Sequence, residues 1–205
     1  MNLKKTKAAF ICWIKRISTV LPVFFWVFLI FSVDEVDMAI MTVVSALIHE
    51  SGHIAYICIA KRIKPTLKGV LSGFRITSIR GLSYDEEIKM YLSGPVVNII
   101  AFLACSFISR FTTFDLWLLG VINMATAISN LVPINGYDGY GVVRAFITKN
   151  ELGEPWIKAL SYISSGLIFF LCILSLYFIN RFGGGYWIFF VFFISMLKHF
   201  KEGFC

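Results

Sequence analysis

The stretch SALIHESGHIAYICI, Ser45–Ile59, places three ionisable side chains inside an otherwise apolar segment. They are His49, Glu50 and His53. A charged side chain at the centre of a membrane helix costs about 2.5–3.5 kcal/mol on insertion scales. Such residues usually face a cavity and act there, although a buried polar network that only holds helices together is the alternative. The question is whether the rest of the chain supplies a membrane setting and a partner for this cluster.

The composition is that of a membrane protein. The chain has 205 residues, of which 58% are hydrophobic and 15% are charged, and its mean hydropathy is +0.79. A typical soluble domain is about 25% charged. The charges also fall in clusters that leave long apolar runs between them. We therefore expect an all-α polytopic membrane protein, folded as a single membrane-embedded domain over residues 1–205.

The pattern of basic residues and cysteines argues against a nucleic-acid-binding protein, a disulfide-stabilised protein and a thiolate zinc site. The net charge of +7 is typical of a membrane protein whose Lys and Arg collect in cytoplasmic loops. No basic stripe alternates with aromatic residues, so nucleic acid is not an expected partner. The five cysteines are widely spaced and form no CxxC pair. Neither a disulfide framework nor a thiolate zinc site is therefore indicated.

Six apolar segments have or approach the roughly 20 residues that a helix needs to cross a bilayer. They are approximately Ile17–Val33, Met38–Ala60, Ile88–Ser109, Phe114–Ile134, Ile157–Ile179 and Tyr186–Phe200. The segment 135–156 that follows the fourth of them is expected to be a loop of mixed composition. The distribution of Lys and Arg among the loops predicts that both termini are cytoplasmic. The second segment then runs inward, and the ionisable cluster lies in its cytoplasmic half.

A short β-hairpin is predicted between the second and third helices. The runs Thr66–Leu71 and Phe74–Ile79 have strand-like composition and are joined by Ser72-Gly73, a two-residue connection typical of hairpins. A solvated loop is the alternative. A hairpin beside a helix bundle would offer an exposed edge to which a peptide strand can add.

Residues 49–53 form the pattern H-E-x-x-H. Residues four apart share a helix face, so both imidazoles can bind one metal ion, and Glu50 can act beside them as a general base. Catalytic zinc takes three protein ligands and leaves a fourth position for water. The remaining histidine, His199, follows Lys198 at the end of the last helix and is expected to be interfacial. A carboxylate must therefore supply the third ligand.

Asp138 is the best placed carboxylate. It lies in NLVPINGYDGY, Asn130–Tyr140, where the fourth helix is expected to break near the depth of the two histidines. The other carboxylates lie in solvated runs or on the opposite side of the predicted membrane. Sequence position alone therefore favours Asp138 as the third ligand.

These motifs together resemble the site-2 protease family of intramembrane zinc metalloproteases. H-E-x-x-H in one membrane helix is followed by N-x-x-P-x-x-x-x-D-G, which here is Asn130, Pro133 and Asp138-Gly139. A third match is SGPVVN, residues 93–98, which resembles the G-P-x-x-N of the family's intervening helix. The resemblance covers about residues 38–140, which is the predicted catalytic core.

The resemblance implies roles for individual residues. His49, His53 and Asp138 would bind Zn²⁺, Glu50 would be the catalytic base, and Asn130 would hold the substrate or the developing oxyanion. Further candidates are implied as structural or substrate-positioning residues. They are Gly94, Pro95, Asn98 and Pro133.

The resemblance also implies an activity and a location. The expected reaction is hydrolysis of a peptide bond in or near a transmembrane segment of a single-span or membrane-associated protein, as in regulated intramembrane proteolysis. The expected location is a bacterial cell membrane, with the site toward the cytoplasm and the lipid bilayer around it. A regulatory membrane partner and a homo-oligomer are both kept open. In arrangement the chain is most similar to the branch that cleaves a sigma-factor precursor during sporulation, without the CBS domain of that branch.

Three alternatives were weighed against this interpretation. A transporter or channel could use His49, Glu50 and His53 as a proton or ion relay, but that would not explain the motif at 130–139. A catalytically silent relative could act as a membrane scaffold, but an intact Glu50 argues against it. A different membrane metalloprotease family would take its third ligand from a Glu on another helix, and no Glu in this chain is suitably placed.

Overall fold

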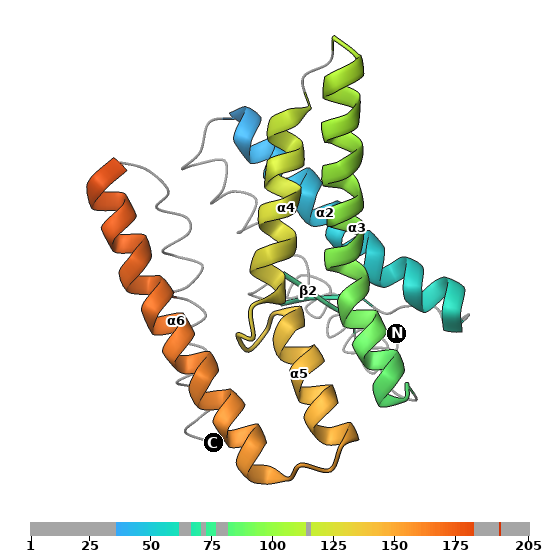
Figure 1. Cartoon of the computed structure of the whole chain (residues 1–205), viewed down its shortest axis with the longest axis vertical. Coiled ribbons are helices and arrows are strands. Elements are labelled where there is room, and N and C mark those ends of the chain that lie inside the picture. The colour runs from blue at the N-terminus through green and yellow to red at the C-terminus, as the bar shows by residue number, and fades with distance from the viewer. Residues whose placement is uncertain are drawn as a thin grey trace, which may run out of the picture.

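The computed structural model describes residues 36–61, 67–70, 73–76, 82–113, 116–182 and 193. Within them the elements are, in chain order, α2 (Val36–Lys61), β1 (Leu67–Val70), β2 (Gly73–Ile76), α3 (Tyr84–Phe111), α4 (Trp117–Leu131), α5 (Asp138–Lys149) and α6 (Glu154–Phe182). Helices α3 and α4 pack side by side, and α2 crosses behind both of them (Figure 1). Helix α5 continues below α4, and α6 starts beside the end of α5 and leans away from α4.

Three of these helices, α2, α3 and α6, are long and apolar enough to cross a membrane. They correspond to the second, third and fifth predicted spans, which agrees with the prediction of a helical membrane protein. The fourth span is shorter than predicted, because α4 has only 15 residues. The predicted span Ile17–Val33 lies outside the described residues, as does Tyr186–Phe200 except for Phe193. The total of six spans therefore stays a prediction.

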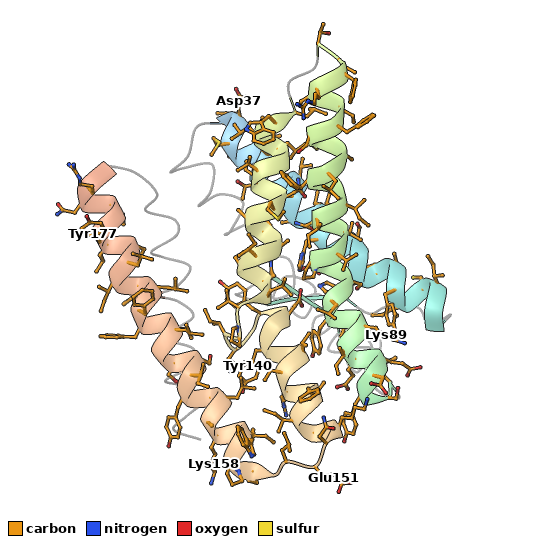
Figure 2. All side chains as sticks on the ribbon, in the orientation of Figure 1. Asp37, Lys89, Tyr140, Glu151, Lys158 and Tyr177 are labelled. Atoms are coloured by element: carbon orange, nitrogen blue, oxygen red, sulfur yellow. The ribbon has the colours of Figure 1, made fainter. Side chains whose placement is uncertain are left out.

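The two ends of the bundle carry charged side chains. Asp37 lies near the start of α2 at the upper end, whereas Lys89, Glu151 and Lys158 lie toward the lower end (Figure 2). Tyr140, in the first turn of α5, lies at about the level of Lys89 and far from Asp37. Which end faces the cytoplasm stays a prediction.

The expected loop at 135–156 is largely a helix, so this part of the prediction was wrong. The buried residues of helix α5 are Gly139, Ala145 and Ile147, whereas its charged residues Arg144 and Lys149 are exposed. This alternation is typical of an amphipathic helix at the edge of a bundle. Such a helix is too short and too polar to be found by a search for membrane spans. Asp138 opens it, where a negative charge is favoured by the helix dipole.

The hairpin lies between α2 and α3, where the sequence places it. Strands β1 and β2 pair antiparallel, with Leu67 opposite Ile76 and Val70 opposite Gly73. Gly73 is therefore a paired strand residue and not a turn residue as predicted. Addition of a peptide strand to this hairpin stays a prediction.

Helix α6 holds the segment that leads into α5. Ile134 in that segment packs with Ile168 and Cys172 of α6, and all three are buried. The Ser164 hydroxyl of α6 also accepts a hydrogen bond of 2.8 Å from the backbone N–H of Asn135. Helix α6 therefore anchors the chain three residues before Asp138.

Helices α2 and α3 cross at Gly52, where their backbones touch. A Cβ added at Gly52 would lie 2.5 Å from the Ser93 carbonyl oxygen and 3.0 Å from the Gly94 Cα. These contacts are with backbone atoms, which cannot move aside as a flexible side chain can. Only glycine therefore permits this approach, as in the small-residue contacts common between membrane helices.

We expect Gly52→Ala to destabilise the protein by about 1–3 kcal/mol, the usual cost of overpacking. The measurement is the thermal unfolding midpoint of the purified chain in detergent. Gly166→Ala in α6 is the matched control, because nothing lies within 4 Å of the added Cβ there and alanine is the better helix former. Equal midpoints for the two variants would contradict the close crossing.

Candidate metal centre

Two histidines of α2 and the first residue of α5 converge on one point. The Nε2 atoms of His49 and His53 are 3.2 Å apart. Oδ2 of Asp138 lies 2.9 Å from His49 Nε2 and 3.2 Å from His53 Nε2. Both histidines are only 5% exposed, and the Asp138 side chain is 13% exposed. One atom from each of three residues thus points into a small, largely buried space.

The local sequence explains this convergence. His49 and His53 are one helical turn apart, so they share a face of α2. Helix α4 ends at Leu131, and the chain turns through Gly136, whose φ of 101° is in the region that favours glycine. Helix α5 then begins at Asp138. The break between α4 and α5 therefore brings the carboxylate under the α2 histidines.

Gly139 is required for the same turn. A Cβ at this position would collide with the Leu131 carbonyl oxygen and come within 2.8 Å of the Val132 oxygen. The start of α5 thus packs directly on the backbone that ends α4. The Asp-Gly pair singled out in the sequence combines a candidate ligand with the residue that lets it approach.

The three atoms suit a bound metal ion better than hydrogen bonds among themselves. Tetrahedral zinc with bonds of about 2.0–2.1 Å places its ligand atoms about 3.3 Å apart, close to the separations found here. Oδ2 of Asp138 is buried and makes no regular hydrogen bond within the described residues. Two imidazole nitrogens and one carboxylate oxygen are also a usual donor set for such a site. His49, His53 and Asp138 could therefore hold a metal ion.

The contacts of His53 fix its orientation and tautomer. Its Nδ1 lies 2.8 Å from the Met90 carbonyl oxygen of α3, and a carbonyl only accepts hydrogen bonds. The proton of neutral His53 therefore sits on Nδ1, and the Nε2 lone pair faces the other two atoms. Metal-bound histidines usually donate their second N–H in this way. The Ser93 hydroxyl, 3.3 Å from Nδ1, also donates to the Met90 carbonyl at 2.6 Å.

Gly94 of α3 forms the wall of the centre opposite Asp138. An added Cβ would lie 2.5 Å from His53 Nε2, 2.7 Å from His53 Cε1 and 2.8 Å from His49 Cε1. A side chain here would therefore occupy the space of both imidazoles. Pro95 follows it and is also buried. The predicted G-P pair thus shapes the centre, with Gly94 in direct contact with both histidines.

Asp138, in the short helix α5, has surroundings that favour its charged form. Burial by itself would raise the pKa of this carboxyl, but the neighbouring His49 and His53 outweigh it and bring the pKa below its usual value. Burial raises the pKa of the adjacent Tyr137 to about 12, so the phenol stays neutral. A carboxylate beside a neutral, apolar neighbour is well suited to bind a cation.

Glu50 lies half-buried next to this cluster, and the ionisable side chains near it are His53, His49 and Asp138. Asn130 lies in the last turn of α4, and its Nδ2 donates to the Thr126 carbonyl oxygen at 2.9 Å. Within the described residues no hydrogen bond joins Asn130 to the three converging side chains. Pro133 lies in the bend between α4 and α5. The catalytic and substrate roles of Glu50 and Asn130 stay predictions.

Several contacts at this centre could not be found from the sequence. The Met90 contact uses a backbone oxygen, which leaves no mark in the residue types. The ring of Tyr91 packs directly against Gly141, since a Cβ added at Gly141 would lie 2.5–2.6 Å from three atoms of that ring. Asn98 was predicted as a structural candidate, and the structure places it where α2, α3 and α4 meet. Its Nδ2 faces the Ser45 and Asn123 carbonyl oxygens at 3.4 and 3.5 Å.

Comparisons with known proteins bear on the fold. No protein-family model and no curated protein matches the sequence. A solved structure, the site-2 protease from Methanocaldococcus jannaschii, matches with a TM-score of 0.62 and 20% sequence identity. The match covers 91% of this chain and 88% of that chain. With its buried His-His-Asp cluster and its apolar helices, the chain therefore has the fold of a site-2 protease.

Proposed function

We propose that this chain is an intramembrane zinc metalloendopeptidase and a member of the site-2 protease family. The observation that carries the proposal is the convergence of His49 Nε2, His53 Nε2 and Asp138 Oδ2 within 3.2 Å of one another. The two histidines of this cluster lie on α2, a helix that is apolar and long enough to cross a membrane. A proton or ion relay is less well supported, because the two imidazoles and the carboxylate point at one another in a closed cluster.

The chemistry follows from the residues around the cluster. Zinc at such a site supplies a bound water whose pKa is lowered to about 7 and polarises the scissile carbonyl. Glu50 would accept the proton of the attacking water and pass it to the leaving amine. His53 is held for its part by the Met90 carbonyl. Asp138 would keep its charge at neutral pH and offset that of the metal.

Asn130 would stabilise the oxyanion that forms during attack. One N–H of its Nδ2 donates to the Thr126 carbonyl oxygen, and the amide has a second N–H that could serve this role. The proposed substrate is a transmembrane or membrane-associated protein segment. A helical substrate must unwind first, because its backbone carbonyls are hidden in helical hydrogen bonds. The proposed location is a bacterial cell membrane, with the cluster toward the cytoplasm.

Zinc content and cleavage of a transmembrane reporter test the proposal. We expect the purified wild-type chain to carry one zinc ion, to lose cleavage with a chelator, and to regain it when zinc is restored. Asp138→Ala should weaken zinc binding at least about 10-fold, since a ligand is lost and not only an outer contact. Asp85→Ala is the matched control, because that carboxylate is exposed and paired with Lys149. A zinc-free wild type with chelator-resistant cleavage would overturn the proposal.

A further inference from the structure

The two histidines of the metal centre differ in their second nitrogen. His53 donates its Nδ1 proton to the Met90 carbonyl. His49 Nδ1 is buried and has no hydrogen-bond partner in the described part of the chain. If His49 is to bind a metal through Nε2, its proton must sit on Nδ1. A buried N–H donor without an acceptor costs about 1–3 kcal/mol, so an acceptor is expected.

A buried polar cluster lies where α2, α3 and α4 meet, one helical turn from His49 on α2 and from Gly94 on α3. Its members are Ser45 of α2, Asn98 of α3, and Asn123 and Thr126 of α4. Ser45, Asn98 and Asn123 are completely buried. Ser45 precedes His49 by four residues, and Asn98 follows Gly94 by four. The Ser45 and Thr126 hydroxyls exchange a hydrogen bond of 2.9 Å.

The cluster contains two acceptors that lack a donor. The Asn98 Nδ2 faces the Ser45 and Asn123 carbonyl oxygens and the Ser45 hydroxyl, at 3.3–3.5 Å. Carbonyls only accept, so this atom must be the amide nitrogen, and Oδ1 points elsewhere. The Oδ1 atoms of both Asn98 and Asn123 are buried, with no partner among the residues the structure describes. Buried amide oxygens are almost always hydrogen-bonded.

The unpaired donor and the Asn98 acceptor lie on neighbouring turns of the packed helices α2 and α3. His49 Cε1 faces Gly94, and Nδ1 is bonded directly to Cε1. Asn98 lies one turn further along α3, a rise of about 5.4–6 Å. Two hydrogen bonds of about 2.8 Å that meet at the roughly tetrahedral angle of one water molecule span about 4.6 Å. A single bridging water would join the imidazole to the amide oxygen of Asn98 if the two side chains turn toward each other across this one-turn spacing.

We propose that Asn98 and Asn123 hold a buried water molecule that accepts the Nδ1 proton of His49. The occupant must accept one hydrogen bond from an N–H and donate to amide oxygens. Water does both, whereas a cation cannot accept a hydrogen bond. Buried waters typically make about three hydrogen bonds to such groups. Ser45 and Thr126 support the site by holding the Asn98 amide in the required orientation.

Asn98 is then a positioning residue that acts through His49. This inference rests on the proposed metal site. Outer contacts of metal-bound histidines are worth about 10–100-fold in metal affinity. The sequence places Asn98 in a motif without assigning it an action. The assigned action is to keep His49 in the tautomer that presents Nε2 to the metal.

A double-mutant cycle on zinc affinity tests the proposal, with affinity measured by competition against a chromophoric chelator. Asn98→Leu keeps a similar volume and removes the acceptor. We expect it to lower zinc affinity about 10–100-fold in the wild-type background, and to have no further effect in His49→Ala. An equal loss in both backgrounds would mean that Asn98 acts only through the overall fold, and would overturn the proposal. Unchanged affinity in Asn98→Leu alone would overturn it as well.

Two further measurements keep the test decisive. Ser175→Ala, which removes a buried hydroxyl of α6 that donates to the Cys172 carbonyl, should leave zinc affinity unchanged. If Asn98→Leu does not fold, Ser45→Ala takes its place in the cycle, with a smaller loss expected in the wild-type background only. Nitrogen-detected NMR of the zinc-loaded chain should show a slowly exchanging proton on His49 Nδ1. A wild type that binds no zinc would remove the proposed function itself, which is a different result from either failure above.

Discussion

Glu50→Gln is expected to keep its zinc and to lose cleavage by about 10²–10⁴-fold, the usual contribution of a general acid–base group. The substitution keeps the size and shape of the side chain and removes its ability to accept a proton. The three residues that could hold the metal, His49, His53 and Asp138, are untouched. Zinc content and reporter cleavage, measured on the same preparation, therefore separate catalysis from metal binding.

The control for Glu50→Gln is the same exchange at Glu151, an exposed residue in the turn between α5 and α6. Glu151→Gln should retain both zinc and cleavage. Full activity in Glu50→Gln would show that another group moves the proton. Loss of zinc in Glu50→Gln would indicate instead that Glu50 helps to build the centre.

Much of this metal centre can be predicted from the sequence, because two of its three candidate ligands lie in one short helical motif. H-E-x-x-H fixes two imidazoles on one face of a helix whatever the surroundings, and an apolar neighbourhood makes chance occurrence a poor explanation. Asp138 could be selected because so few other carboxylates lie at a suitable depth. The long apolar runs likewise predict α2, α3 and α6, since burial in lipid demands little of a helix beyond length and composition.

The remaining features depend on contacts between distant parts of the chain. Helix α5 was predicted as a loop because its apolar face is narrow and is covered only when α3 and α6 are in place. Gly73 could be assigned either to the turn or to the strand, and the pairing with Val70 decides it. Several partners of His53 and Asn98 are backbone oxygens, of Met90, Ser45 and Asn123, and every residue has a backbone oxygen. Sequence reasoning therefore finds the ligating side chains more readily than the groups that hold them.

Gly94→Ala is expected to lower zinc affinity at least about 100-fold, more than the loss of one outer contact. The added methyl would lie 2.5 Å from His53 Nε2 and 2.8 Å from His49 Cε1, so it displaces both imidazoles at once. Helix α3 cannot simply withdraw, because Gly52 holds its backbone against α2 at the same level. The histidines must therefore rotate away from Asp138, and cleavage should fall with the metal. Alanine is also the better helix former, so a weaker α3 would not explain the loss.

The matched control for Gly94→Ala is Gly120→Ala in α4. There the added Cβ would lie 3.2 Å from the Cys105 Cβ, which is also a crowded contact between helices but one remote from the metal centre. Gly120→Ala should lower the unfolding midpoint somewhat and leave zinc affinity unchanged. If Gly94→Ala retained wild-type zinc affinity, the imidazoles would have an alternative position that still binds zinc. That result would contradict the geometry in which Gly94 forms the wall of the centre, while the ligand assignment would still rest on Asp138→Ala.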